Sequence, residues 1–324
     1  MHTAIKCALL AGAMALSGCS SHPEERRALD AGSKGWQILA PLAGGPRQET
    51  AVVALANEIY VIGGFIDSQT IVSRVEAYDP KSDTWRDAAP LPRPLHHPNA
   101  AVVDGRLYVL GALVGPQFVA VGDVYRYDPK TNAWEQLNSM PPSTERGAGG
   151  TVAIGAKIYV AGGYRLGSVA DFSAYDTAAD TWEILPSLSE ARDHLVGGAV
   201  GGKVYAVGGR RNGSLRGSVD EFDPSSGAWG SKAPMLTARA GCAAAVIADR
   251  IYVAGGEGNR SAQSGVFPQN EAYDPAKNRW EALQPMLTPR HGTGGAALNG
   301  IFFVPGGATR EGFGAADNNE AYAP

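Results

Sequence analysis

The fold of this chain is set by residues 151–163, TVAIGAKIYVAGG, with DFSAYD at 171–176 and DTWEIL at 180–185. The first segment contains two apolar runs joined by the turn Gly155-Ala156, and it ends in a glycine pair. That pattern is typical of a β-hairpin. The other two segments alternate polar and apolar residues, as strands do. We therefore expect a four-stranded antiparallel meander.

The same pattern occurs six times, at intervals of 46 to 51 residues. Five copies place an aromatic residue seven positions before a Trp. The glycine pairs or their equivalents are Gly63-Gly64, Gly111-Ala112, Gly162-Gly163, Gly208-Gly209, Gly255-Gly256 and Gly306-Gly307. Self-similarity at such a period indicates a repeat architecture, so each copy is one structural unit that packs on its neighbours.

The two ends of the chain complement each other. The sixth copy stops at Pro324 before reaching its Trp, whereas residues 35–42, GWQILAPL, are an isolated fourth strand. We expect this N-terminal strand to complete the last of six units. Two copies depart from the pattern: the second has Gly111-Ala112 for its glycine pair and Leu95 where the others have Arg, and the sixth has Pro305 inside its second strand. These departures predict local irregularity.

Taken together, the Gly-Gly, aromatic and Trp positions resemble the motif of the kelch family of β-propellers. The resemblance covers Trp36 to Pro324 and implies an all-β, six-bladed propeller in which each blade is a four-stranded sheet. It also implies that two sets of loops share one face around the pocket. These are the loops that enter each blade and the loops that follow each glycine pair.

The first residues predict export. Lys6 precedes an apolar core from Cys7 to Leu16, which is too short to span a bilayer. Leu16-Ser17-Gly18-Cys19 resembles the lipobox of bacterial lipoproteins, which implies lipidation of Cys19 and anchoring in the cell envelope, with Ser20 compatible with the outer membrane facing the periplasm. An ordinary cleaved signal peptide is the alternative. We expect a signal peptide at 1–18, a polar tether at 19–34 and the propeller at 35–324.

The composition of the chain limits the classes of molecule that it could bind. The chain has 28 Lys and Arg against 32 Asp and Glu and no basic run, which argues against nucleic acid. We expect a monomer with no cofactor.

The sequence also contains residues of the types that bind metal ions. His96, His97, Asp193 and His194 are possible zinc or copper ligands, but no HxH or HExxH spacing enforces such a site, and no metal is predicted. The copper-radical oxidases of this fold need a Tyr cross-linked to Cys, and Cys242 lies in a predicted inner strand, where a buried inert thiol is expected.

An arginine stands sixteen residues before most of the glycine pairs: Arg47, Arg146, Arg192, Arg239 and Arg290. These arginines either bridge blades or form a cationic ring that holds an anion. The next two positions vary between copies and contain all four histidines of the folded body, His96, His97, His194 and His291. We therefore expect the functional face at these loops.

Ligand contacts are predicted for polar and aromatic residues of the two loop sets, and no catalytic residue is assigned. The predicted ligand-binding residues are Phe65, His97, Tyr164, His194, Arg210, Arg216, Glu257, Arg260, His291 and Arg310.

The sequence favours a non-catalytic module, anchored in the envelope, that binds a protein, peptide or glycan through this face. The alternative is a sugar mutarotase or epimerase of the N-acetylneuraminate type, because six-bladed periplasmic kelch proteins include sialic-acid mutarotases. That resemblance implies a Glu directly after one loop turn and an Arg six residues later. Here Arg216 fits the Arg position, Arg210 occupies the Glu position, and Glu257 is the nearest acidic equivalent. A structural role at the membrane is the third possibility.

Overall fold

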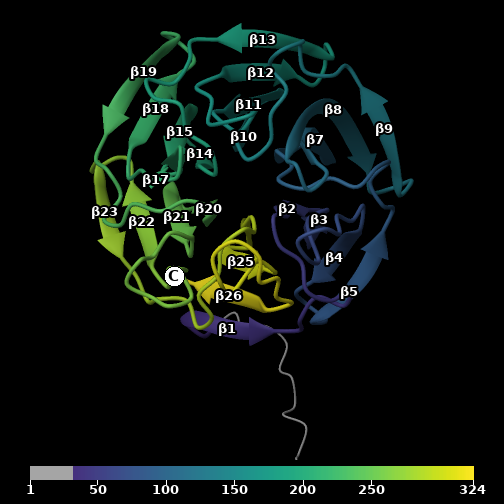
Figure 1. Ribbon diagram of the computed structural model, residues 1–324, viewed down its shortest axis with the longest axis vertical. Helices are drawn as coiled ribbons and strands as arrows, with labels where there is room; N and C mark the ends of the chain where they lie inside the picture. The colour runs from purple at the N-terminus through teal and green to yellow at the C-terminus, as the bar shows by residue number, and fades with distance from the viewer. Residues whose placement is uncertain (1–31) are drawn as a thin grey trace, which may run out of the picture.

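The computed structural model describes residues 32–324, which form six four-stranded antiparallel sheets arranged as blades around a central axis (Figure 1). The predicted all-β, six-bladed propeller is confirmed. The predicted signal peptide, Cys19 and most of the tether lie outside the described residues. No helix within residues 32–324 is long and apolar enough to cross a bilayer.

Each blade runs from an inner strand at the axis to an outer strand at the rim. Blade one has β2 (Ala51–Leu55), β3 (Glu58–Ile62), β4 (Val75–Asp79) and β5 (Thr84–Ala88). Blade two has β6 (Ala100–Val103), β7 (Arg106–Val114), β8 (Val119–Asp128) and β9 (Ala133–Leu137). Blade three has β10 (Gly150–Ile154), β11 (Lys157–Ala161), β12 (Phe172–Asp176) and β13 (Thr181–Leu185).

The second half of the ring repeats this order. Blade four has β14 (Val196–Val200), β15 (Lys203–Val207), β18 (Val219–Asp223) and β19 (Ala228–Lys232), with a short loop hairpin of β16 (Arg210–Arg211) and β17 (Ser214–Leu215). Blade five has β20 (Ala243–Ile247), β21 (Arg250–Ala254), β22 (Asn270–Asp274) and β23 (Arg279–Ala282). Blade six has β24 (Ala296–Leu298), β25 (Ile301–Pro305), β26 (Asn319–Ala323) and β1 (Gly35–Leu39).

The N-terminal strand closes the ring. β1 pairs antiparallel with β26 along its whole length, with Trp36 opposite Tyr322, and the two lie side by side at the rim (Figure 1). The Trp36 indole also donates a 2.9 Å hydrogen bond to the carbonyl of Gln284, which follows the outer strand of blade five. The predicted completion of the last blade by the N-terminal strand is therefore confirmed.

The repeated Trp links every blade to the one before it. In each blade the indole Nε1 donates to a main-chain carbonyl just beyond the preceding outer strand, at 2.7 to 3.1 Å. The pairs are Trp36 with Gln284, Trp85 with Ala40, Trp134 with Ala89, Trp182 with Asn138, Trp229 with Pro186, and Trp280 with Ala233. The indole buries its apolar body and still satisfies its donor.

The glycine pairs make the second link between blades. A Cβ on Gly255 would lie 2.1 Å from the carbonyl oxygen of Arg290 in the next blade, and the φ of Gly255 is +69°, so only glycine fits. The N–H of Gly256 donates to that same carbonyl at 2.8 Å. The side chain of Arg290 in turn donates to Gly306 of its own blade at 2.9 Å. Each such arginine therefore joins two blades.

This arrangement decides between the two predicted roles of the arginines. All five are at most 1% exposed, and their guanidinium groups donate to main-chain carbonyls and, in several blades, to a buried carboxylate. They bridge blades and do not form a cationic ring at the mouth of the channel.

Blade two is irregular, as its broken motif predicts. A β-bulge between Leu110 and Ala112 interrupts the β7–β8 ladder, and Asn99 donates from its side chain to the carbonyls of Leu110 at 3.0 Å and Arg146 at 2.9 Å. Blade six is irregular as well. Pro305 is the last residue of β25 and pairs with Asn319 of β26, but the ladder between β24 and β25 has only three pairs and stops at Phe303.

Candidate functional site

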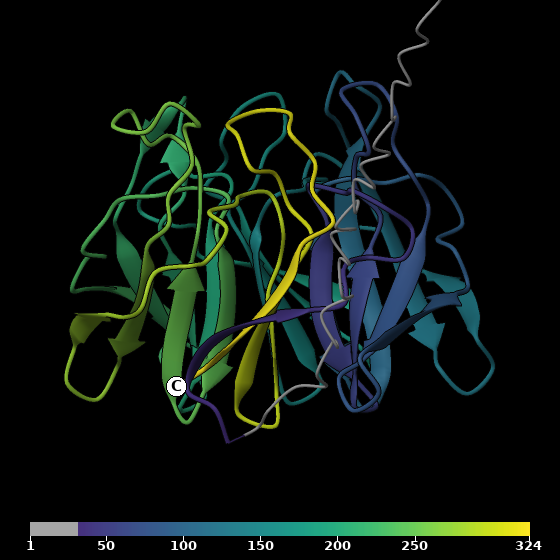
Figure 2. The same cartoon turned by 90° about the horizontal axis from the view of Figure 1, so that it is seen from below.

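The two loop sets meet on one face of the ring, as the family resemblance implies. In every blade, the residue after the arginine position forms a β-bridge with the residue after the glycine pair. The bridged pairs are Gln48 with Phe65, His96 with Leu113, Gly147 with Tyr164, Asp193 with Arg210, Ala240 with Glu257, and His291 with Ala308. In the side view the longer loops gather along this face (Figure 2).

The next residue of each entry loop belongs to a closed ring of hydrogen bonds around the channel. Its N–H donates to the carbonyl of the equivalent residue in the preceding blade, and the sixth bond returns to the first. We call this ring the channel collar; its members are Glu49, His97, Ala148, His194, Gly241 and Gly292. All six have φ between +50° and +65°. The collar therefore holds six equivalent Cα positions at one level of the channel.

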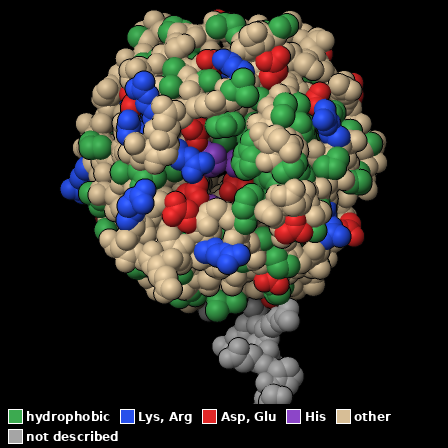
Figure 3. Space-filling model, viewed as in Figure 1, with side chains coloured by type: hydrophobic (Ala, Val, Ile, Leu, Met, Phe, Trp, Pro, Cys, Tyr) green, Lys and Arg blue, Asp and Glu red, His purple; other side chains and the backbone are tan. Residues whose placement is uncertain are grey.

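Large side chains occupy only part of the collar. Glu49, His97 and His194 are large, while the other three members are Ala or Gly. A Cβ on Gly292 would lie 2.5 Å from Glu49 Oε1, so the small residue leaves space that the carboxylate fills. In the space-filling view, histidine and acidic side chains are visible in a hollow at the centre of this face (Figure 3).

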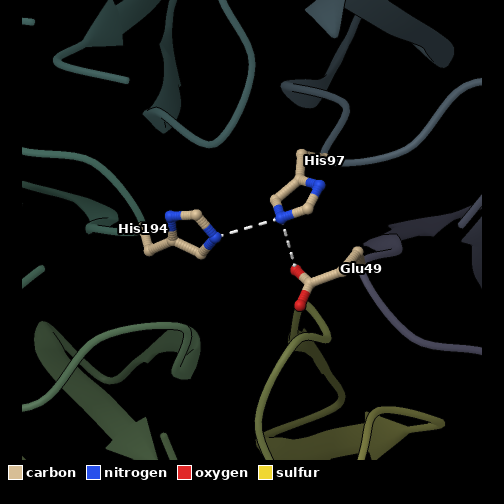
Figure 4. A group of neighbouring side chains, drawn as sticks. All are labelled: Glu49, His97 and His194. Carbon is tan, nitrogen blue, oxygen red and sulfur yellow. Dashed lines mark hydrogen bonds and ion pairs between the residues drawn. The ribbon is translucent and has the colours of Figure 1, made fainter. Parts of the chain in front are cut away.

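His97 contacts the other two large side chains directly. His97 Nε2 lies 3.0 Å from His194 Nε2 and 2.9 Å from Glu49 Oε2 (Figure 4). The three residues are at most 9% exposed. Their ligand-type atoms all lie within 4.8 Å of one another, so the group is able to hold a metal ion.

Arg210 and Glu257 extend this cluster from the loops of blades four and five. Arg210 donates to Asp193 Oδ1 at 2.9 Å and to Glu257 Oε1 at 2.5 Å. Its Nη2 lies 3.2 and 3.3 Å from the two ring nitrogens of His194, which places the guanidinium over the face of that ring. His291 Nδ1 lies 3.4 Å from Glu257 Oε2.

Burial and charge set the protonation of the cluster. Burial lowers the pKa of His96 to about 3 and also lowers the pKa of His194, where Arg210 adds to the effect. Burial opposes ionisation of Glu49, but the neighbouring His97 outweighs it and holds the pKa of Glu49 well below its usual range. For Asp193, burial is likewise outweighed, chiefly by the hydrogen bond from His194, and the pKa falls to about 2.

Two cavities adjoin the collar. One, of about 160 Å³, lies within the channel and is lined by the collar and the first residues of the inner strands. The other, of about 230 Å³, opens on the loop face. Glu49, His97 and His194 line both cavities, and Arg210, Glu257, Phe118 and Phe313 line the outer one. A small ligand in the outer cavity would therefore contact charged groups from four blades.

The structure brings together four of the predicted ligand-binding residues at the outer cavity: His97, His194, Arg210 and Glu257. His291 lies beneath them, 1% exposed. Phe65 is fully buried, and its ring packs 4.2 Å from that of His96, so it supports the cluster and does not face a ligand.

The remaining predicted residues lie away from the cluster. Arg216 pairs with Glu190 at 2.8 Å, Arg260 is exposed on its loop, and Arg310 donates to the carbonyl of Phe313 at 2.5 Å. Tyr164 is half-buried, with its ring 6.4 Å from that of Phe118. Sequence reasoning missed Glu49 as a site residue and named Asp193 only as a possible metal ligand, although they hold the same loop positions as His97 and His96. That positional equivalence is the signal that would have found them.

Cys242 behaves as its sequence context predicts. Its thiol is buried and donates to the carbonyl of Gly255 at 3.3 Å, and burial raises its pKa to about 11. It lies beside the inner cavity as a protonated, unreactive group.

Similar proteins share this architecture. Kelch-like protein terF of Aspergillus terreus is 36% identical over 280 residues, which is 81% of this chain and 61% of terF. Human Kelch-like protein 23 is 29% identical over 66% of this chain and 46% of its own length. This chain thus spans less than two thirds of these relatives. The solved structure of YjhT superposes with a TM-score of 0.73 at 19% identity, covering 87% of this chain and 96% of that one, which shows the shared fold.

Family models match the repeats themselves. The model of the KLHDC2/KLHL20/DRC7 Kelch-repeats domain matches residues 28–209, and the Kelch motif matches residues 191–236 and 238–287. The first match alone covers more than half of the chain. The chain belongs to the kelch-repeat family.

Proposed function

We propose that the outer cavity is the active site of a sugar mutarotase or epimerase, the activity that the sialic-acid mutarotase resemblance implies. The observation that carries the proposal is the convergence of Glu49, His97, His194, Arg210 and Glu257 on one small cavity. Acid–base catalysis needs two proton-exchanging groups that a bound substrate contacts from different sides. A cluster that served only to hold blades together would not need to line a cavity.

The chemistry needs only proton transfers. A base removes the proton of the anomeric hydroxyl while an acid protonates the ring oxygen, and the bond between the anomeric carbon and the ring oxygen opens. After rotation, the same transfers in reverse close the ring on the other face. Glu257 of blade five lies across the channel from His97 of blade two, which pairs with Glu49 at 2.9 Å. We assign Glu257 as the base and the His97–Glu49 pair as the acid.

Arg210 gives the cavity a preference for an acidic sugar. Its guanidinium lines the cavity, is held in place by Asp193 and Glu257, and is 29% exposed. A sugar carboxylate would exchange with one of these two carboxylates for a charge-assisted hydrogen bond. We therefore assign the carboxylate-binding role to Arg210 and not to Arg216, the residue at the Arg position of the mutarotase resemblance. Arg216 pairs with Glu190 on the outer part of the loop.

The test is anomerisation followed by NMR with purified protein, using N-acetylneuraminate, a uronic acid and a neutral hexose. We expect acceleration over buffer, greatest for an acidic sugar, and a loss of about 10²-fold or more in Glu257→Gln. Glu190→Gln, a carboxylate of the same face outside the cavity, is the matched control and should keep the wild-type rate. Unchanged rates for all three sugars would overturn the proposal.

A binding module is the second candidate function, and one observation favours it. Large apolar side chains stand exposed on the loops that follow two of the glycine pairs, Ile66 at 41% and Leu166 at 95%. Such residues are suited to a protein or peptide partner. The NMR rates combined with melting temperatures separate the two functions. A sugar or peptide that raises the melting temperature of the protein, with no sugar changing its rate of anomerisation, would favour binding alone.

A further inference from the structure

The hydrogen bonds in and around the collar fix which ring nitrogen carries the proton when each histidine is neutral. His96 Nε2 is 3.1 Å from the carbonyl oxygen of Gly115, which only accepts, so this nitrogen carries the proton and His96 Nδ1 is a lone pair. His97 Nδ1 lies 2.6 Å from that lone pair and must donate to it. The other nitrogen, His97 Nε2, is then also a lone pair.

The same reasoning applies to the partner histidine. His194 Nδ1 lies 2.5 Å from Asp193 Oδ1, a carboxylate oxygen, so Nδ1 carries the proton and Nε2 is a lone pair. Three lone-pair atoms therefore converge: His97 Nε2, His194 Nε2 at 3.0 Å from it, and Glu49 Oε2 at 2.9 Å from it. With neutral rings, nothing donates among these three atoms, and their contact is repulsive unless a metal ion lies between them or His97 carries a second proton.

A third buried ring nitrogen, Nδ1 of His291, lies close to Glu49 and Glu257 without a hydrogen-bond partner within residues 32–324. His291 is 1% exposed, and its Nε2 donates to the carbonyl of Arg310 at 2.9 Å, which leaves Nδ1 as a lone pair. Nδ1 has no hydrogen-bond partner among the described residues. It lies 3.8 Å from Glu49 Oε1 and 3.4 Å from Glu257 Oε2, both acceptors. This nitrogen too calls for a positive partner, because a buried acceptor left unpaired is destabilising.

The net charge of the cluster also favours a bound cation. The cluster contains three carboxylates, Glu49, Asp193 and Glu257, all at most 9% exposed, against the single guanidinium of Arg210. With neutral histidines, two negative charges are left over in a buried site. Uncompensated buried charge is strongly unfavourable. A divalent cation balances the cluster.

We propose that the channel collar binds a divalent transition-metal ion of the zinc class through Glu49 Oε2, His97 Nε2 and His194 Nε2. Bonds of roughly 2.0–2.2 Å in a tetrahedral site place ligand atoms about 3.3 Å apart. His97 Nε2 lies 3.0 Å from His194 Nε2 and 2.9 Å from Glu49 Oε2, and all three ligand atoms lie within 4.8 Å of one another. Two imidazoles and one carboxylate suit zinc, cobalt or nickel and do not suit magnesium. The fourth position faces the cavities, where water or a ligand oxygen would bind.

The surroundings support metal binding. A metal-binding histidine usually donates its other ring N–H to a carboxylate, a carbonyl or water, and that contact fixes the ring. His194 donates to Asp193 in this way, and His97 is fixed through His96, which donates to Gly115. Asp193 and His96 are positioning residues. Metal binding does not require the proposed isomerase activity; if an ion is bound, the group at its fourth position replaces the His97–Glu49 pair as the acid.

The test uses tag-free, EDTA-treated full-length protein titrated calorimetrically with Zn²⁺, Co²⁺ and Mg²⁺. We expect one Zn²⁺ per chain, a higher melting temperature with Zn²⁺, and no binding of Mg²⁺. The cobalt protein should show tetrahedral visible bands without a thiolate charge-transfer band, which excludes the cysteines as ligands. His97→Gln and His194→Gln should each lower Zn²⁺ affinity by about 100-fold or more.

Two variants sharpen the assignment. Asp193→Asn should lower Zn²⁺ affinity by about 10- to 100-fold while keeping the one-to-one stoichiometry and the cobalt bands, as expected of a positioning residue. Glu190→Gln, a carboxylate on the same face outside the collar, should bind Zn²⁺ as the wild type does. Wild-type affinity in both histidine variants would overturn the proposal, because a bound ion would then lie elsewhere.

Zn²⁺ titration of the wild-type protein tests the proposal by itself, so the test does not depend on the variants being able to fold. Absence of one-to-one Zn²⁺ binding means that a proton on His97 satisfies the cluster, and the proposal is wrong. Failure of the isomerase proposal gives a different result: Zn²⁺ binds but no sugar changes rate. If full sugar turnover persists in metal-free protein, the isomerase stands and the ion has no part in it.

Discussion

Arg192 shows at the residue scale how a buried charge fixes the loop that enters a blade against that same blade. Its guanidinium, fully buried, donates to the carbonyl of Gly208 at 2.9 Å and pairs with Asp220. Arg192→Met would keep the volume but leave that carboxylate buried and unpaired. We expect a loss of about 3–5 kcal/mol in the free energy of unfolding, measured by urea denaturation.

The matched control is an exposed arginine of the same chain. Arg93 pairs with Asp123 at 3.2 Å, and its side chain is 45% exposed. Because water already solvates both groups, Arg93→Met should cost less than about 1 kcal/mol. Equal losses in the two variants would mean that the buried Arg192–Asp220 pair contributes no more to stability than an exposed pair does.

At the scale of the element, β1 carries the closure of the ring. Trp36 is 8% exposed, packs 5.2 Å from the ring of Tyr322, and donates to Gln284 of the neighbouring blade. We expect Trp36→Ala to lower the free energy of unfolding by about 3–5 kcal/mol. Trp36→Phe keeps an aromatic ring and loses the hydrogen bond, so its cost should be nearer about 1 kcal/mol. Chemical denaturation measures both.

The same strand provides the control. Ile38 lies two residues along β1 with its side chain 75% exposed. Ile38→Ala leaves the backbone pairing with β26 intact and should change stability by no more than about 0.5 kcal/mol. A large effect at Ile38, or none at Trp36, would show that β1 does not act as the proposed closure.

At the scale of the whole molecule, the ring closes in blade six, where the C-terminal strand β26 pairs with the N-terminal strand β1. β26 and β1 are antiparallel neighbours, with Ala323 opposite Gly35, so a short turn can join them. A circular permutant that links Pro324 to Gly35 and opens the turn between Asp104 and Gly105 should fold, with a melting temperature within a few degrees of the wild type. Deletion of residues 1–41 should lower that temperature far more, because blade six then lacks its outer strand.

Differential scanning calorimetry compares the three proteins. In the permutant, closure moves to the β6–β7 hairpin of blade two, and every Trp link between blades is retained. If the permutant and the deletion lose stability equally, chain connectivity at that hairpin matters as much as the outer strand, and β1 has no special part in closure.

Much of the fold could be predicted because it rests on local repetition. The Gly155-Ala156 turn joins β10 and β11 at the expected place, and the broken motif at Gly111-Ala112 became a bulge. The candidate site was predicted less well. The prediction included His97, His194, Arg210 and Glu257 together with Arg216, Arg260 and Arg310. The family resemblance implies which loops share a face, but the sequence does not show which side chains turn inward.

The sequence by itself determined the six blades and the completion of the last blade by Trp36, since both follow from residue types at a fixed spacing. The shared loop face was implied by the resemblance to the kelch family. Only the tertiary structure decided that His97 contacts Glu49 and His194. These residues come from three different blades, and their contact depends on the closed ring of hydrogen bonds that brings equivalent positions to one level. The glycine pairs repeat in nearly every blade and allow the blades to pack. The side chains at the positions where the copies differ come within contact distance only when the ring closes.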